Sequence, residues 1–257
     1  MARSKLLLEA HLKALRLPTF LREYDQLARQ CAAESLDSRS FLQQLCELKL
    51  LDREQRATER RIKAAKFPVT KSLDTFDFPA LPALNKKLVL ELARCEFIDR
   101  RENVLALGNS GTGKTHIGLA LGLAACQRGY RTRFTTAAAL VNELLEARDE
   151  RRLLRCQKQL TKQDLLIVDE LGYVPLSKTG AELLFEVFSQ RYEQGSTLVT
   201  SNLPFGRWGE TFADDVVAAA MIDRLIHHAE VLTLTGDSYR TRQRRELLAK
   251  ENRTNRA

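Results

Sequence analysis

The first 66 residues carry apolar side chains at the spacing of α-helices. Leucines predict a first helix that ends before Pro18, and Pro18 suits the first turn of a second helix. A third helix is expected to begin near Asp37 or Ser38. The residues expected on the inward faces are Leu6, Leu7, Leu12, Leu15, Phe20, Leu21, Tyr24, Leu27, Ala28, Phe41, Leu42, Leu45, Cys46 and Leu48. The pattern predicts a small all-α N-terminal domain over residues 1–68.

From residue 103 onward, short apolar runs alternate with helical patterns. The runs predict strands at 103–107, 165–169, 197–201 and 230–234, and residues 131–136 are a further candidate strand. The intervening segments predict helices at 114–127, 137–147, 180–194 and 214–227. This alternation predicts an α/β domain, a parallel sheet with helices on both faces, over residues 69–240. Prolines between residues 67 and 82 indicate a linker, residues 84–100 a further helix, and residues 241–257 a basic tail.

The third predicted helix becomes almost wholly polar between residues 52 and 66. Its cations Arg53, Arg56, Arg60 and Lys63 fall roughly along one side. One interpretation is an arm that contacts the phosphates of DNA. The other is an exposed helix stabilised by pairs four residues apart, such as Glu59 with Lys63.

The segment after the first predicted strand fits the phosphate-binding loop pattern G-x-x-x-x-G-K-[ST] at every fixed position. Backbone N–H groups of such a loop bind phosphate oxygens, helped by the N-terminus of the following helix. Lys114 is expected to reach the β- and γ-phosphates, and Thr115 to bind Mg²⁺. The nucleotide-binding residues expected here are Gly108, Asn109, Ser110, Gly111, Thr112, Gly113, Lys114, Thr115 and His116, the last in a structural rather than a catalytic role.

Polar residues follow two other predicted strands. Asp169 and Glu170 end the strand Leu165-Leu-Ile-Val168, at the strand end where ligands bind in open α/β sheets. Asp169 is expected to hold Mg²⁺, and Glu170 to activate water as a general base. Asn202 follows the strand 197–201 and either orients that water or only begins a turn. The order Asp169-Glu170 separates ATP hydrolases from P-loop kinases, whose catalytic bases lie elsewhere, so an ATP hydrolase is favoured over a small-molecule kinase.

Arg224 lies in a helix just before the last predicted strand. An arginine suits phosphate oxygens in a transition state, so Arg224 is predicted to act in a neighbouring subunit's site. The alternative is a salt bridge to Asp223 or another acid.

His227 and His228 are interpreted as residues of the helix end and not as metal ligands. Phe76 or Phe78 either stacks on the adenine ring or anchors the linker.

Charge is distributed unevenly along the 257 residues, which carry a net charge of +8. Residues 1–70 hold 14 Lys and Arg against 9 Asp and Glu, residues 239–257 hold 7 against 2, and residues 71–238 hold 20 against 22. Basic ends beside a nucleotide site favour a polyanion partner over merely solvated helix faces.

Cys31, Cys46 and Cys126 are interpreted as reduced core residues of a cytoplasmic protein. No apolar run is long enough for a membrane span.

Taken together, these motifs resemble the AAA+ ATPases, and more closely the IstB-type transposition helpers of bacterial insertion sequences, which are related to DnaC-type helicase loaders. The resemblance rests on Gly108-Asn-Ser-Gly-Thr-Gly-Lys-Thr-His116, Leu165-Leu-Ile-Val-Asp-Glu-Leu-Gly-Tyr173, Thr200-Ser-Asn-Leu-Pro-Phe205, Met221-Ile-Asp-Arg-Leu225 and Gly236-Asp-Ser-Tyr-Arg240. It implies the additional-strand branch of P-loop ATPases. It also implies ATP-dependent assembly of a homo-oligomeric ring or spiral on double-stranded DNA, DNA remodelling, and delivery of target DNA to a partner transposase.

A helicase loader that binds a replicative helicase remains the alternative, because the ATPase core does not distinguish the two. Only about twenty residues follow the last predicted strand, too few for the helical lid of other AAA+ proteins. We therefore expect a neighbouring subunit to close the nucleotide pocket. Arg240 is a candidate second phosphate sensor, whereas Arg242, Arg244 and Arg245 are candidates for contacts with DNA or the partner.

Overall fold

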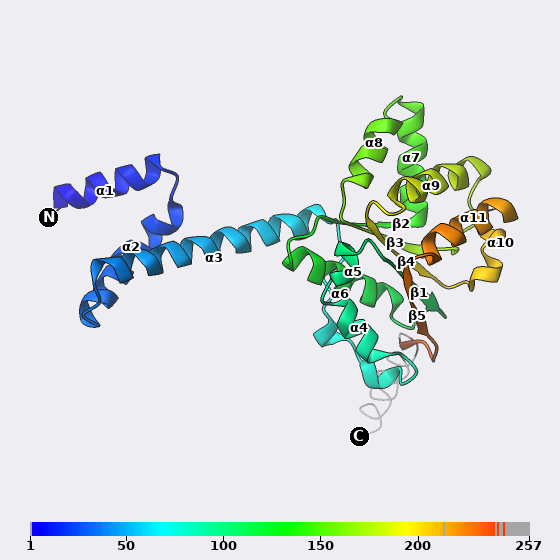
Figure 1. Ribbon diagram of the computed structural model, residues 1–257, viewed down its shortest axis with the longest axis horizontal. Coiled ribbons are helices and arrows are strands. Elements are labelled where there is room, and N and C mark those ends of the chain that lie inside the picture. The colour runs from blue at the N-terminus through cyan, green and yellow to red at the C-terminus, as the bar shows by residue number, and fades with distance from the viewer. Residues whose placement is uncertain (1, 213, 240, 242–243, 245–257) are drawn as a thin grey trace, which may run out of the picture. The chain divides into compact units, whose positions relative to one another are not determined.

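The computed structural model describes residues 2–212, 214–239, 241 and 244 (Figure 1). The chain divides into two compact units, Met1–Arg60 and Arg61–Ala257, and the division falls within helix α3. The first unit therefore ends eight residues before the boundary expected at residue 68. Within the described part of the chain, no helix is both long and apolar enough to cross a bilayer.

The first unit consists of α1 (Ala2–Ala14), α2 (Pro18–Ala33) and the amino-terminal part of α3 (Ser38–Ala64). Leu27, Cys31 and Leu45 form its small core. The hydroxyl of Tyr24 donates to Glu9 across α1 and α2, and that of Thr19 donates to Asp52 across α2 and α3. The three predicted helices are confirmed.

The core of this unit is narrower than the apolar pattern predicts. Leu45 is 3% exposed, whereas its neighbours Leu42 and Leu48 are 54% and 36% exposed. Cys46 is also exposed, so its interpretation as a core residue is wrong. Adjacent helix positions point about 100° apart, and only one stripe of α3 is covered. Leu6, Leu7, Leu15 and Ala28 are likewise exposed rather than inward-facing.

The second unit is a parallel five-stranded sheet. The strands are β1 (Asn103–Gly108), β2 (Thr132–Thr136), β3 (Leu165–Leu171), β4 (Ser196–Ser201) and β5 (Ala229–Leu234), in the spatial order β2-β3-β4-β1-β5. Every pairing is parallel. The predicted α/β fold is confirmed, and β4 lies between β1 and β3, as the additional-strand arrangement requires.

Helices cover both faces of this sheet (Figure 1). One face packs against α4 (Lys86–Leu92), α5 (Glu96–Asp99) and α6 (Lys114–Gln127). The other packs against α7 (Ala137–Asp149), α8 (Leu153–Thr161), α9 (Lys178–Arg191), α10 (Gly209–Phe212) and α11 (Asp215–Ile226). Successive strand residues point to opposite faces, so Leu165 and Ile167 join the first core and Leu166 and Val168 the second.

Two local predictions were wrong or incomplete. Residues 84–100 form two short helices instead of one, because Cys95 adopts a left-handed backbone conformation with φ of 63° between them. Helix α8 was missed, since only Gln157 and Leu160 of its nine residues are buried. The linker contains two 3-10 turns, η1 (Leu73–Thr75) and η2 (Phe78–Ala80).

The buried side chain of Asn103 connects three elements at the start of β1. Its amide donates to the carbonyl of Leu225 at 3.1 Å, and its oxygen accepts from the N–H of Thr197 at 2.9 Å. Asn103→Ala leaves both backbone groups without their partner, which we expect to lower the free energy of unfolding by about 2–4 kcal/mol. Urea denaturation followed by fluorescence of Trp208, the chain's one tryptophan, measures this. Asn142→Ala on the exposed face of α7 is the control, expected within about 0.7 kcal/mol of the parent chain.

Thiol accessibility gives a second prediction. Burial raises the pKa of Cys95 to about 11 and also raises the pKa of Cys126 and Cys156, so these thiols stay protonated at pH 8. Cys31 is 4% exposed. We expect Ellman's reagent at pH 8 to modify Cys46 in the fast phase, and Cys46→Ser to abolish that phase. A fast phase that persists in Cys46→Ser contradicts the packing described for the other four.

Candidate functional site

The loop between β1 and α6 has a backbone that favours glycine at three positions. Gly108, Gly111 and Gly113 have φ values of 149°, 78° and 92°. A Cβ added at Gly108 would lie 2.0 Å from the carbonyl oxygen of Leu234, and one at Gly113 would lie 2.7 Å from the ring of Phe76. The loop is therefore a close-fitting backbone turn without side chains at these points, which leaves its N–H groups accessible to a ligand.

Lys114 begins α6 and is 9% exposed. Its Nζ donates to the carbonyl oxygens of Gly108 and Asn109, each at 2.7 Å. The Thr112 hydroxyl donates to the carbonyl of Asn109 at 2.8 Å and helps fix the turn. A lysine ammonium at the amino end of a 14-residue helix creates a site for an anion.

Thr115 and Asp169 meet at the carboxyl edge of the sheet. The Thr115 hydroxyl lies 3.1 and 3.0 Å from the two carboxylate oxygens of Asp169. Asp169 is 3% exposed, and the Thr200 hydroxyl also donates to its Oδ1. Two hydroxyl contacts therefore hold this buried carboxylate.

Glu170 and Asn202 end neighbouring strands and line the same cavity. Glu170 is exposed, and its backbone is left-handed with φ of 61°. The Oδ1 atom of Asn202 is buried, and no hydrogen-bond partner for it is found among the described residues. An acceptor in this position is suited to a ligand or a water molecule with a proton to donate.

The cavity beside the loop has a volume of about 660 Å³. It lies between the loop, the strand ends and the linker, with Phe76, Gly113, Lys114, Thr115 and Glu170 among its lining residues. A space of this size holds a nucleotide-sized ligand.

The linker is held against the loop by His116 and Phe76. The His116 Nε2 lies 2.9 Å from the carbonyl oxygen of Ser72 and 3.3 Å from the Thr75 hydroxyl. The Phe76 ring makes an edge contact with His116 at 5.2 Å and with Phe78 at 4.8 Å. Of the two linker phenylalanines, Phe76 lines the cavity and Phe78 does not. His116 lines the cavity as well, and its contacts are those of a residue that supports the linker.

The segment after β5, which contains the Gly236–Arg240 motif, also reaches the loop. The N–H of Tyr239 donates to the carbonyl of Gly111 at 3.0 Å, and Asp237 and Tyr239 line the cavity. Gly111 admits this approach, because a Cβ there would lie 2.2 Å from the Ser238 hydroxyl. Arg240, Arg242 and Arg245 lie outside the described residues, and Arg244 is exposed.

Arg224 does not line its own chain's cavity. It lies near the end of α11, just before β5, whereas the loop follows the opposite end of β1. Its guanidinium stacks on the Phe185 ring at 4.7 Å and donates to the carbonyl of Ala220 at 3.0 Å. Within the described part of the chain, Arg224 forms no salt bridge with Asp223 or another acid.

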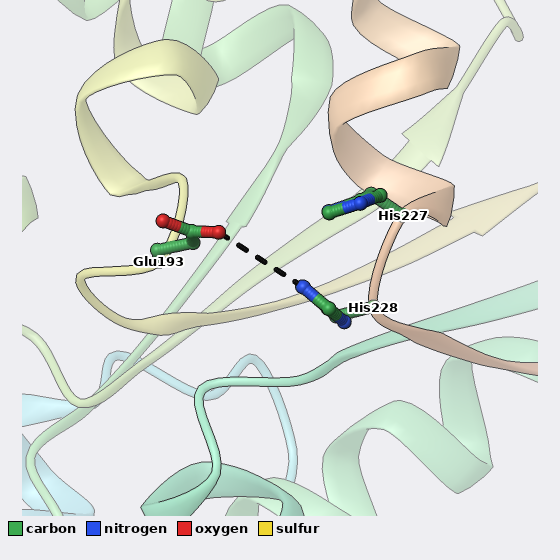
Figure 2. Close-up of side chains that lie close together, drawn as sticks. All are labelled: Glu193, His227 and His228. Atoms are coloured by element: carbon green, nitrogen blue, oxygen red, sulfur yellow. Dashed lines mark ion pairs between the residues drawn. The ribbon is translucent and has the colours of Figure 1, made fainter.

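A cluster of Glu193, His227 and His228 (Figure 2) lies beside the start of β5, and none of the three lines this cavity. All three side chains are exposed, and their ligand atoms lie within 4.8 Å of one another. His228 lies 3.9 Å from Glu193, and the Tyr192 hydroxyl lies 2.7 Å from His227 Nδ1. His227 is the C-cap residue of α11 and His228 immediately precedes β5, which agrees with their interpretation as residues of a helix end.

Comparison with known proteins identifies the family to which the chain belongs. The family model described as IstB-like ATP binding protein matches residues 10–247. The chain belongs to the IstB-like ATP binding protein family. The resemblance inferred from the motifs is thereby confirmed, and with it the assignment as an ATP-binding protein of the ATPase class.

Curated relatives extend over nearly the whole chain. A protein of insertion sequence IS5376 from Geobacillus stearothermophilus, named for ATP binding, is 40% identical over 90% of this chain and 92% of its own length. A protein of insertion sequence IS21 from Pseudomonas aeruginosa, also named for ATP binding, is 40% identical over 93% of this chain and 90% of its own.

Solved structures show the fold of this IstB-like protein. AMPPCP-bound DnaA from Aquifex aeolicus aligns with a TM-score of 0.55 and 20% identity over 70% of this chain and 54% of its own. The structure of DnaI aligns with a TM-score of 0.54 and 20% identity over 64% of this chain and 91% of its own. At these identities the likeness concerns the fold alone, and it agrees with the predicted AAA+ arrangement.

The donor atoms in this IstB-like site fit a magnesium ion. Thr115 and Asp169 offer only oxygen, at hydrogen-bond distance from each other, and Mg²⁺ prefers oxygen ligands in proteins. Among the described residues, no ion pair to Asp169 lies within 4.0 Å.

The residues expected to contact DNA lie on α3. Arg53, Arg56, Arg60 and Lys63 are all exposed, and Arg56 pairs with Asp52 at 3.2 Å. A second basic surface was not anticipated, because counts over long segments conceal it. Arg155, Lys158 and Lys162 are exposed and recur at helical spacing along α8 and its C-cap, and the exposed Arg151 lies just before the helix. They line a shallow groove, and none forms an ion pair within the described part of the chain. We call these four residues the α8 basic strip.

Proposed function

We propose that this protein is a cytoplasmic, ATP-dependent helper of transposition. In this proposal it forms a homo-oligomer on double-stranded DNA, remodels target DNA and delivers it to a partner transposase. The observation that carries the proposal is the convergence of Lys114, Thr115, Asp169, Glu170 and Asn202 around one nucleotide-sized cavity.

The proposed chemistry is hydrolysis of ATP to ADP and phosphate. The loop N–H groups from Gly108 to Thr115 and the Lys114 ammonium bind the phosphates, while Thr115 and Asp169 hold Mg²⁺, which screens the phosphate charge. Glu170 accepts a proton from a water molecule. The oxygen of that water bonds to the γ-phosphorus while the bond between the γ-phosphorus and the oxygen that leaves with ADP breaks. Asn202 orients that water through its unpartnered amide oxygen.

Arg224 is proposed to complete the site of a neighbouring subunit. Its position near the opposite end of the strands from its own loop supports action between subunits. Its stacking on Phe185 leaves the guanidinium without an acidic partner among the described residues. An arginine supplied by a second subunit makes assembly depend on the γ-phosphate, and hydrolysis then loosens the interface.

Two basic surfaces support DNA as the polyanion. The exposed cations of α3 and the α8 basic strip each present a row of charges at helical spacing. Rows of this kind contact phosphates without reading bases, so little sequence preference is expected.

The relatives favour transposition over helicase loading. Both relatives at 40% identity are named as proteins of insertion sequences. A helicase loader is the second candidate, because the ATPase core does not distinguish the two classes. Pull-down with a transposase encoded beside this gene, compared with a replicative helicase, separates the two.

The nucleotide role predicts distinct effects for two variants. Lys114→Ala removes the ammonium within the loop, so ATP binding should be lost. Glu170→Gln should lower the rate of phosphate release about 10²–10⁴-fold while ATP still binds, so that the protein stays assembled on DNA. Phosphate release with and without DNA, and sedimentation with and without ATP, measure both.

The matched control for Glu170→Gln is Glu182→Gln, an exposed glutamate on α9. It should keep the parent's rate of phosphate release. Rapid turnover by Glu170→Gln would refute its assignment as the base. Assembly of the parent chain that ignores nucleotide would refute the proposed coupling.

The α8 basic strip predicts a change in the salt dependence of DNA binding. Arg155→Ala with Lys158→Ala should weaken duplex binding and flatten the plot of log K against log salt by about 0.9 for each phosphate that the variant no longer neutralises. Fluorescence anisotropy at several salt concentrations measures the slope. Lys87→Ala with Arg100→Ala removes two exposed cations from another face and should leave the slope unchanged. Equal slopes for both double variants would exclude the strip from the DNA interface.

A further inference from the structure

Strand β3 contains a β-bulge where its two carboxylates lie. Val168 pairs with Val199 and Leu171 pairs with Ser201, so β3 advances three residues while β4 advances two. Asp169 and Glu170 therefore both lie opposite one residue, Thr200. A bulge leaves one residue outside the regular ladder, and here the φ of 61° at Glu170 marks the irregular position.

The Thr200 hydroxyl forms hydrogen bonds with both residues of the bulge, Asp169 and Glu170. It accepts from the N–H of Glu170 at 3.0 Å and donates its proton to Oδ1 of Asp169. Thr200 is 1% exposed, although its side chain forms part of the cavity wall. One hydroxyl has a single proton to donate, so its donation to Asp169 leaves its lone pairs for the Glu170 N–H. The orientation of one carboxylate and the backbone of the other thus depend on the same atom.

Neighbouring polar residues of β4 do not share this role. The Ser201 hydroxyl contacts the N–H and carbonyl of Leu203, beyond the strand. The Thr197 hydroxyl accepts from Arg191 at 3.2 Å, near the other end of the strand. Among the described residues of β4, Thr200 alone contacts both Asp169 and Glu170.

We propose that Thr200 is a positioning residue for Mg²⁺ and for the attacking water, through its paired contacts with Asp169 and Glu170. This inference rests on the proposed ATP hydrolysis and gives a role to Thr200, a residue of the Thr200–Phe205 motif to which the motif itself assigned none. The Thr200 hydroxyl fixes the Asp169 carboxylate so that its other oxygen, with the Thr115 hydroxyl, faces a cation. It also fixes the backbone from which Glu170 extends into the cavity. Side chains that orient a metal ligand typically change metal affinity or activity 10–100-fold when removed.

The test compares Thr200→Val with Thr200→Ser. Valine keeps the shape of threonine but removes the hydroxyl, whereas serine keeps it. Binding of a fluorescent, non-hydrolysable ATP analogue is measured in EDTA and across a Mg²⁺ titration. We expect the Mg²⁺ concentration for half-maximal enhancement of binding to rise about 10–100-fold in Thr200→Val, with affinity in EDTA within about twofold of the parent chain. Thr200→Ser should restore the parent's Mg²⁺ dependence.

Thr197→Val is the matched control, because it removes a buried hydroxyl from the same strand at the end away from the cavity. It should lower the melting temperature without changing the Mg²⁺ dependence. Parent-like Mg²⁺ dependence in Thr200→Val, or equal loss of affinity in EDTA and in Mg²⁺, would overturn the inference. If Thr200→Val does not fold, Thr200→Ala replaces it, and equal Mg²⁺ dependence for alanine and serine would overturn it. Failure of the parent chain to bind the analogue would instead refute the proposed function itself.

Discussion

The placement of β4 between β1 and β3 is the constraint on which the site depends. Adjacent strands lie about 4.8 Å apart, so the ends of β1 and β3 are separated by roughly 10 Å. The loop after β1 and the carboxylates of β3 can therefore face a ligand from two sides, while β4 supplies Thr200 and Asn202 between them. The Thr115–Asp169 contact spans this gap and brings a helix hydroxyl to the buried carboxylate. A direct β1–β3 pairing would leave no strand to contribute these polar groups.

The sequence predicts this arrangement well where one physical effect dominates. Four of the five strands were located as short, largely apolar runs between polar turns, whereas β2 has only one apolar residue, Phe134. Lys114, Thr115, Asp169 and Glu170 were predicted because glycine spacing and strand-end carboxylates have few structural alternatives. Errors arose where local pattern and tertiary packing disagree. Cys46 occupies a helical apolar pattern but is exposed, since α2 covers only one stripe of α3. Cys95 breaks a helix through a backbone angle that no composition signals.

Thr200 and the α8 basic strip show two other limits of prediction from the sequence. Threonine is ordinary in a buried strand, and its importance follows from a register shift between β3 and β4, which depends on pairing in space rather than on either sequence. The strip disappears when charge is summed over residues 71–238, because acids elsewhere in that segment cancel it. The helix places Arg155, Lys158 and Lys162 on one exposed side, and Arg151, two residues before α8 begins, lines the same groove. Charge therefore has to be counted by surface as well as by segment.

The position of Arg224 bears on how one nucleotide could control an assembly. A six-residue strand spans about 20 Å, and Arg224 lies near the end of β5 opposite to the loop that follows β1. A side chain cannot cover that distance within one subunit, whatever its rotamer. If Arg224 acts on a γ-phosphate, that phosphate must belong to another subunit, and the same bond then contributes to both catalysis and association. Loss of the γ-phosphate weakens the two together, which is the physical basis for expecting hydrolysis and release of DNA to be coupled.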